Sequence, residues 1–180
     1  MRSHHLPGLE GRVSESTRVA LPQLERFKKA QDRPGAGFER ALAEMRTGCK
    51  RGHWIWYVFP QLAGLGSSVL SHTYAVSDVA EAEAFLRDPV LRSRLLTITT
   101  AVAERVRRDG VQLEDLMSSS IDVLKLVSSL TLFGTVARRL YGAEGREDHA
   151  SLACMAEEVL AAAAAEGYPP CEYTCLQLGV

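Results

Sequence analysis

The residues with the most potential for chemistry lie in one stretch, residues 50–68. His53 stands directly before the only two tryptophans, Trp54 and Trp56, and Gln61 follows them. An imidazole exchanges protons near neutral pH, and indole rings stack on flat ligands. A buried segment needs aromatic rings, but it does not need a histidine and a glutamine at its two ends. The stretch is therefore a candidate ligand site.

Each of these residues also has a purely structural interpretation. Trp54 and Trp56 are equally typical of anchors in a hydrophobic core. His53 is consistent with a hydrogen-bonded residue at the entrance of the segment. Gln61, which follows a proline, is consistent with a side chain that pairs with buried peptide groups. The sequence leaves both interpretations open.

Basic and small residues flank the aromatic rings. Lys50 lies near His53 in a small positive cluster that suits a phosphate group, although a solvated run of charges explains it equally well. After the rings, Gly64, Gly66 and Ser68 form a Gly-x-Gly-Ser-Ser pattern whose backbone N–H groups are able to wrap a phosphate. The pattern lacks the endings of a P-loop and of a dinucleotide fingerprint, and a plain turn is the alternative.

A second polar group lies far along the chain, on a predicted helix. Asp122 and Lys125 are three residues apart and suit a surface ion pair. Ser128 and Ser129 follow between strongly apolar positions, which is unusual for an exposed helix face. We hypothesise that Lys125, Ser128 and Ser129 face the same cleft as His53.

Helical periodicity dominates the elements that must position these residues. We predict a mostly α fold, a single-domain multihelical array, with a short irregular or strand-like aromatic segment at 54–59. Residues 1–22 are predicted to be a disordered leader, and residues 23–180 a single helical domain. The predicted helices cover residues 24–31, 38–47, 78–87, 89–109, 120–141 and about 152–166, with a short turn of helix near 113–117.

Composition excludes several classes of function. The 180 residues include 21 basic and 22 acidic side chains, so nucleic acid is an unlikely partner. We expect no membrane span and no export signal, hence a cytoplasmic protein with four reduced cysteines. Their spacing does not match a zinc site; we expect no metal and no cofactor, and the oligomeric state is open.

These residues resemble a bacterial family known as the domain of unknown function 1810, often mislabelled calpastatin-like. The resemblance covers about residues 24–176 and implies a helical single domain without an established activity. Tyr74 joins the candidate ligand-binding set through it. Val123 and Val127 stand where the family usually has an acidic and a basic residue, a departure that implies altered binding if those positions bind. The motifs that carry it are His53-Trp54-x-Trp56-x-x-Phe59-Pro60-Gln61-Leu62, Gly64-x-Gly66-x-Ser68, Tyr74-Ala75-Val76 and Asp122-x-Leu124-Lys125-Leu126-x-Ser128-Ser129.

A fainter likeness is to the NADAR family, which acts on N-glycosidic bonds of ADP-ribose-type or riboflavin-precursor substrates. Both have a short aromatic segment that ends near Phe and Gln. Both then have helices with a pattern like Phe85-Leu86-x-x-Pro89-x-Leu91-x-x-x-Leu95. The acidic residue that precedes the aromatic segment in NADAR proteins has no counterpart here.

The leading expectation is a small enzyme that acts on a nucleotide or ADP-ribose-like small molecule, with N-glycosidic hydrolysis as the candidate reaction. The alternatives are a non-catalytic ligand-binding or protein-interaction module, and a domain in which the aromatic stretch is only the folding core. The candidate catalytic residues are His53, Gln61, Asp122 and Lys125. The candidate ligand-binding residues are Lys50, Trp54, Trp56, Gly64, Gly66, Ser68, Tyr74, Ser128 and Ser129.

Overall fold

The longest helix, α8 (Ser120–Glu144), lies at the centre of the fold. Its apolar side chains recur every three or four positions, and Val123, Leu126, Leu130 and Phe133 are fully buried. A helix that is apolar on most of its circumference must be covered by other elements. Neighbouring helices, described below, provide that cover.

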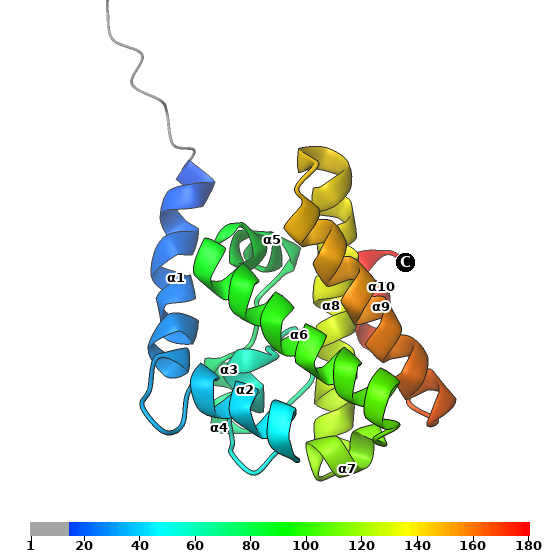
Figure 1. Cartoon of the computed structure of the whole chain (residues 1–180). Coiled ribbons are helices and arrows are strands. Elements are labelled where there is room, and N and C mark those ends of the chain that lie inside the picture. The colour runs from blue at the N-terminus through cyan, green and yellow to red at the C-terminus, as the bar shows by residue number, and fades with distance from the viewer. Residues whose placement is uncertain (1–14) are drawn as a thin grey trace, which may run out of the picture.

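The computed structural model describes residues 15–180, with side chains from residue 23 onward. Most of the predicted leader lies outside these residues, and α1 begins at Glu15 rather than at the predicted Leu24. This part of the chain contains ten helices (Figure 1). Besides α8 they are α1 (Glu15–Gln31), α2 (Phe38–Thr47), α3 (Ile55–Val58), α4 (Val69–Thr73), α5 (Val79–Arg87), α6 (Pro89–Asp109), α7 (Leu113–Met117), α9 (Glu147–Ala165) and α10 (Glu172–Leu178). The predicted mostly α, multihelical fold is confirmed.

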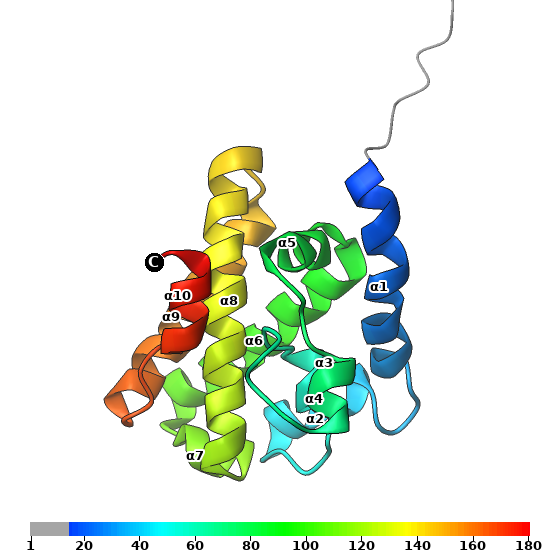
Figure 2. The same ribbon diagram turned by 180° about the vertical axis from the view of Figure 1, so that it is seen from behind.

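The helices cover α8 from two sides. Helix α9 crosses α8 diagonally on one side, with α6 packed against α9 (Figure 1), while α10 and the segment from α3 to α5 lie on the other side of α8 (Figure 2). Helix α1 lies farther out, against α3 and α5. This arrangement brings residues 50–76, from the first half of the chain, beside the start of α8.

Local capping fixes the helix ends where the sequence predicts them. Asp78 accepts a hydrogen bond from the backbone N–H of Glu81 at 2.8 Å. Asp88 caps α6 with bonds of 3.0 Å from the N–H groups of Val90 and Leu91. Gly110 ends α6 at a φ of 62°, a left-handed conformation that glycine adopts without strain.

The aromatic stretch, which periodicity left open between strand and helix, folds as the single turn α3. Phe59 leaves helical geometry with φ −120° and ψ 70°, as expected for a residue before a proline. Among the described residues the nearest feature to a sheet is an isolated bridge between Leu62 and Val76. Helix α4 was not predicted, and it contributes no buried residue.

Helix α8 is also long and apolar enough to cross a membrane by length and composition alone. However, 67% of its most apolar window is buried inside the fold. The core helix of a globular domain has these same properties, and we interpret α8 in that way. The predicted cytoplasmic location remains a prediction.

The contact between α8 and α9 depends on a glycine. A Cβ atom added at Gly134 would lie 2.9 Å from the Cβ of Ala156, closer than van der Waals contact allows. We expect Gly134→Val to lower the free energy of unfolding by about 2 kcal/mol through overpacking, as measured by urea denaturation. Gly142 is the matched control, because an added Cβ there meets nothing within 4 Å and Gly142→Ala should stabilise α8 by about 0.5–1 kcal/mol. A Gly134→Val protein as stable as the wild type would contradict the close approach.

Candidate functional site

The loop after α2 is fastened to the start of α8 through the backbone of Lys50. The Lys50 N–H donates to the carbonyl of Leu116 at 2.8 Å, and the hydroxyl of Ser118 donates to the carbonyl of Lys50. Ser118 itself has a φ of 65° between α7 and α8, a conformation uncommon for residues other than glycine. These bonds direct the side chain of Lys50 toward the first turn of α8.

Two ammonium groups share one carboxylate there, and we call these three residues the Lys–Asp–Lys cluster. Asp122 accepts from Lys50 Nζ at 2.6 Å and from Lys125 Nζ at 2.8 Å, one on each oxygen. The three side chains are 7%, 14% and 16% exposed for Lys50, Asp122 and Lys125. Burial favours the protonated carboxyl, but hydrogen bonds from Lys125 and Lys50 and their charges outweigh it, so the pKa of Asp122 lies below its ordinary value. The cluster therefore carries a net charge of +1.

Trp56 lies directly beside this cluster. Lys125 Nζ lies 3.9 Å from the centroid of the Trp56 ring, a close cation–π contact. The indole is only partly buried, so part of its surface remains accessible. The Lys125 ammonium has three donors, and one of them is used by Asp122.

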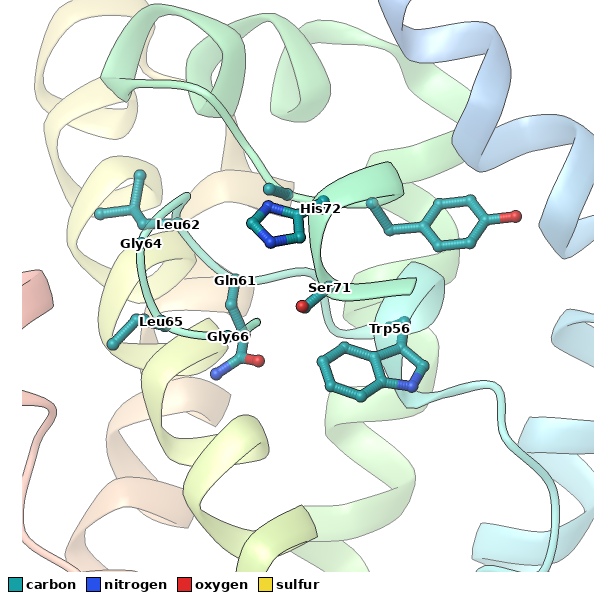
Figure 3. Close-up of a pocket in the computed structure, with 10 residues that line it drawn as sticks. Trp56, Gln61, Leu62, Gly64, Leu65, Gly66, Ser71 and His72 are labelled. Carbon is teal, nitrogen blue, oxygen red and sulfur yellow. The ribbon is translucent and has the colours of Figure 1, made fainter. Parts of the chain in front are cut away.

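Gln61 lies across from Trp56, on the other side of the space between them (Figure 3). Its Nε2 donates to the hydroxyl of Ser128, which in turn donates to the carbonyl of Lys125 at 3.2 Å. Figure 3 shows the amide of Gln61 and the indole of Trp56 on the two sides of one space, with the hydroxyl of Ser71 directed between them. Gln61, Ser128, Lys125 and Trp56 thus form one connected set, which together with Asp122 we call the wall. Of the hypothesised group of Lys125, Ser128, Ser129 and His53, this set includes Lys125 and Ser128.

A small cavity lies beside Trp56 and Gln61, and neither Lys125 nor Ser128 is among the residues that line it. It is lined by Trp56, Gln61, Gly66, Ser71 and neighbours in the loop between α3 and α5, and it measures about 10 Å³. That is about the room one water molecule needs. A ligand larger than a water molecule therefore requires the loop to move before it can enter.

Trp54 is a core residue, one of the two interpretations that the sequence left open. It is fully buried, and its indole N–H donates to Glu44 at 2.7 Å. Glu44 also accepts from the N–H groups of Arg51 and Gly52 and from Arg40. Burial raises the pKa of Glu44, but these hydrogen bonds lower it to about 2 overall. Trp54 thus offers no ring face to a ligand, and it fastens the 50–53 loop to α2.

Three further candidates also lie away from the wall. His53 is exposed, and its side chain makes no hydrogen bond within the described part of the chain. Ser129 is fully buried in the core, and its hydroxyl has no partner among the described residues. Tyr74 is buried against Tyr57 and Phe27 and only borders the cavity. Within the described part of the chain, no hydrogen bond joins His53 or the Ser129 hydroxyl to Lys125.

The Gly-Ser pattern forms a turn and a cap. Gly64 has a φ of 98°, and Gly66 allows Ser71 and Trp56 to pack closely, because a Cβ there would lie 2.7 Å from the Cβ of Ser71. The hydroxyl of Ser68 accepts from the N–H of Ser71 and caps α4. Ser68 is thus used inside the loop, which weakens the prediction that this pattern wraps a phosphate.

The two family departures lie in the core. Val123 and Val127 are 0% and 1% exposed, on the side of α8 that packs inside the domain. In this chain both positions contribute packing and do not face the wall.

Sequence reasoning missed Glu44, Ser71 and Tyr173. Glu44 and Arg40 are four residues apart on α2, a spacing that predicts only a surface pair, and nothing local indicates the loop that Glu44 binds. The hydroxyl of Tyr173 on α10 donates to the carbonyl of Ala63 at 2.9 Å, a contact across 110 residues. Such long-range partners leave no local signal in a single sequence.

Comparison with known proteins places this geometry in a family. The model of a family described as protein of unknown function (DUF1810) matches residues 22–144. The crystal structure of the conserved hypothetical protein Rv1873 from Mycobacterium tuberculosis is similar, with 34% identity and a TM-score of 0.67 over 88% of this chain and 97% of that one. No protein of curated function matches the chain. The NADAR likeness gains no support from these matches. Among the described residues, no group of three or more His, Cys, Asp or Glu side chains is placed to hold a metal.

The geometry around Glu44 predicts a specific acid sensitivity. We expect Glu44→Gln to lower the free energy of unfolding at pH 7 by about 2 kcal/mol, because several donors lose a charged acceptor. The folded pKa of about 2 lies below the ordinary 4.5, so the unfolded chain binds the proton first. The contribution is therefore complete above pH 4.5 and is lost as the pH falls toward 2. Urea titrations across this range should show a shallower pH dependence in Glu44→Gln. Glu39→Gln, an exposed change on the same helix, should leave the pH dependence of the wild type unchanged.

The Lys–Asp–Lys cluster predicts a coupled loss. Asp122→Asn leaves two poorly hydrated ammonium groups without a counter-charge and should cost about 3 kcal/mol of unfolding free energy. Adding Lys50→Met, which removes the more buried charge, should restore part of that loss. A double-mutant cycle by urea denaturation measures the coupling. Strictly additive losses would show that Lys50 and Asp122 do not depend on each other.

Proposed function

The chain belongs to the DUF1810 family of proteins of unknown function, and from the geometry of its site we propose that it binds a small nucleotide-like or ADP-ribose-like molecule. The ligand would carry a planar ring and an anionic group. Trp56, Gln61 and Lys125 would contact it, and Lys50 and Asp122 would support Lys125.

The observation that carries this proposal is the ammonium of Lys125 resting 3.9 Å above the ring of Trp56. An accessible indole beside a positive charge matches a ligand that combines a flat ring with a phosphate. The amide oxygen of Gln61 accepts no hydrogen bond from the described residues and faces the Trp56 side in Figure 3. It is available to accept from a base edge or a ribose hydroxyl.

Binding fits the site better than proton transfer does. The one carboxylate in the wall, Asp122, is held by two ammonium groups and has a lowered pKa. A general base works best when its pKa lies near the working pH, so Asp122 is a weak choice for activating water. N-glycosidic hydrolysis by this domain remains a prediction, and it would need a ligand that loosens the Lys–Asp–Lys cluster.

A thermal-shift screen with AMP, NAD and ADP-ribose tests the proposal. A ligand at a hundredfold its dissociation constant should stabilise the fold by about 2.7 kcal/mol. Trp56→Ala should weaken its binding by about 1–3 kcal/mol. Lys125→Met keeps the apolar stem of the side chain and removes its charge. It should weaken the binding of phosphorylated ligands but not the binding of the matching nucleosides.

Lys29→Met is the control, because Lys29 is an exposed lysine on α1, away from the wall. Binding that survives both Trp56→Ala and Lys125→Met in well-folded protein would place the ligand elsewhere. A blank screen with folded wild-type protein would favour a protein-interaction role instead. A positive screen would be followed by an assay for release of free base from the bound ligand.

A further inference from the structure

The loop that closes the small cavity makes few buried contacts with the rest of the described chain. Residues 63–73 contain no buried residue, although Leu62 and Tyr74 on either side are buried. The segment includes α4, whose Val69 is 81% exposed. Backbone segments with few buried apolar contacts open at low free energy.

The two ends of this segment are nevertheless fixed. At its base, the N–H of Ala63 donates to the carbonyl of Val76, and the N–H of Val76 donates to the carbonyl of Gln61, both at 2.8 Å. Leu62 and Val76 are buried at that bridge. Movement would therefore be confined to the part between the two anchors, as in a compact surface loop with neighbouring ends.

Most other hydrogen bonds of the segment stay within it. Ser68 and Ser71 bond each other, and the hydroxyl of Thr73 donates to the carbonyl of Val69. Toward the rest of the described chain, Tyr173 of α10 supplies a side-chain bond, from its hydroxyl to the carbonyl of Ala63. A Cβ added at Gly64 would lie 2.6 Å from that hydroxyl, so the close approach requires glycine at 64.

We propose that residues 64–73 are a lid over Trp56 and Gln61, that the Tyr173 hydroxyl latches it by holding the carbonyl of the Ala63–Gly64 peptide at its first hinge, and that the lid must open to admit the ligand. The lid rests on the proposed function for its purpose, but its opening is a separate property. The cavity beneath it holds about one water molecule, and Figure 3 shows Gly66 of the lid beside Gln61 and the Ser71 hydroxyl between Gln61 and Trp56. Opening the lid would uncover the indole and the amide together.

Hydrogen exchange of the full chain tests the latch without any ligand. Tyr173→Phe keeps the ring and removes only the hydroxyl. It should speed amide exchange in residues 64–74 by about fivefold, the shift expected for one lost neutral hydrogen bond. The five-residue α4 is too short to persist once released, so its amides should report the opening. Exchange in α8 should not change.

Tyr168→Phe is the matched control, because the Tyr168 hydroxyl also makes one bond, to Glu114 at 2.8 Å, away from the lid. Acrylamide quenching gives a second readout: Trp54 is buried, so added quenching in Tyr173→Phe reports Trp56. Unchanged exchange and quenching in Tyr173→Phe, or the same change in Tyr168→Phe, would overturn the latch.

Ligand binding then separates this proposal from the proposed function. If AMP and ADP-ribose bind and Tyr173→Phe raises their association rate, both proposals are supported. If neither binds but the lid opens in Tyr173→Phe, the latch stands and the nucleotide function fails. If they bind while exchange and association stay the same in Tyr173→Phe, the lid proposal fails alone.

Discussion

The burial of α8 is the constraint on which the rest of the structure depends. A helix enclosed on most sides must pair most of its polar groups, because an unpaired buried polar group is costly; the hydroxyl of Ser129 is an exception on α8. Thr131 donates to the carbonyl of Val127 and accepts from the N–H of Cys171, which docks the start of α10. The hydroxyl of Ser128 accepts a hydrogen bond from the amide of Gln61, and the carboxylate of Asp122 pairs with Lys50 and Lys125. The polar residues of α8 are thus the points at which distant segments attach to it.

This constraint explains which parts of the fold the sequence predicts. Helix ends depend on neighbours within a few residues, so Asp88, Pro89 and Gly110 reveal both ends of α6 locally. The extended α1 and the short α4 were not predicted, since α1 begins in a stretch without clear periodicity and α4 has no buried residue. The form of the aromatic stretch depends on how it packs, and its own pattern fits strand and helix equally.

The two tryptophans show why the site was only partly predictable. In a strand, residues two apart point to the same face, whereas in a helical turn they lie about 200° apart. Because the stretch forms α3, Trp54 packs inward onto Glu44 and Trp56 turns toward Lys125. Choosing the wrong secondary structure assigns both rings the same role. The pairing of Gln61 with Ser128 and of Lys50 with Asp122 spans about seventy residues. The sequence hypothesis, which used the unusual polarity of α8 to group Lys125, Ser128 and Ser129 with His53, included neither pair.

Under the proposed function, different members of the Lys–Asp–Lys cluster would serve stability and ligand recognition. Lys50 is the most buried of the three, and its backbone is also bonded to Leu116 and Ser118, so it cannot reach a ligand without breaking the fold locally. Each carboxylate oxygen of Asp122 already accepts a hydrogen bond from a lysine. Lys125 is the most exposed and has spare donors beside Trp56, so an incoming anion would compete with Asp122 for this ammonium alone. A bound anion would then leave Lys50 to hold Asp122, and the charge of the cluster would be balanced by the ligand without a change in the core.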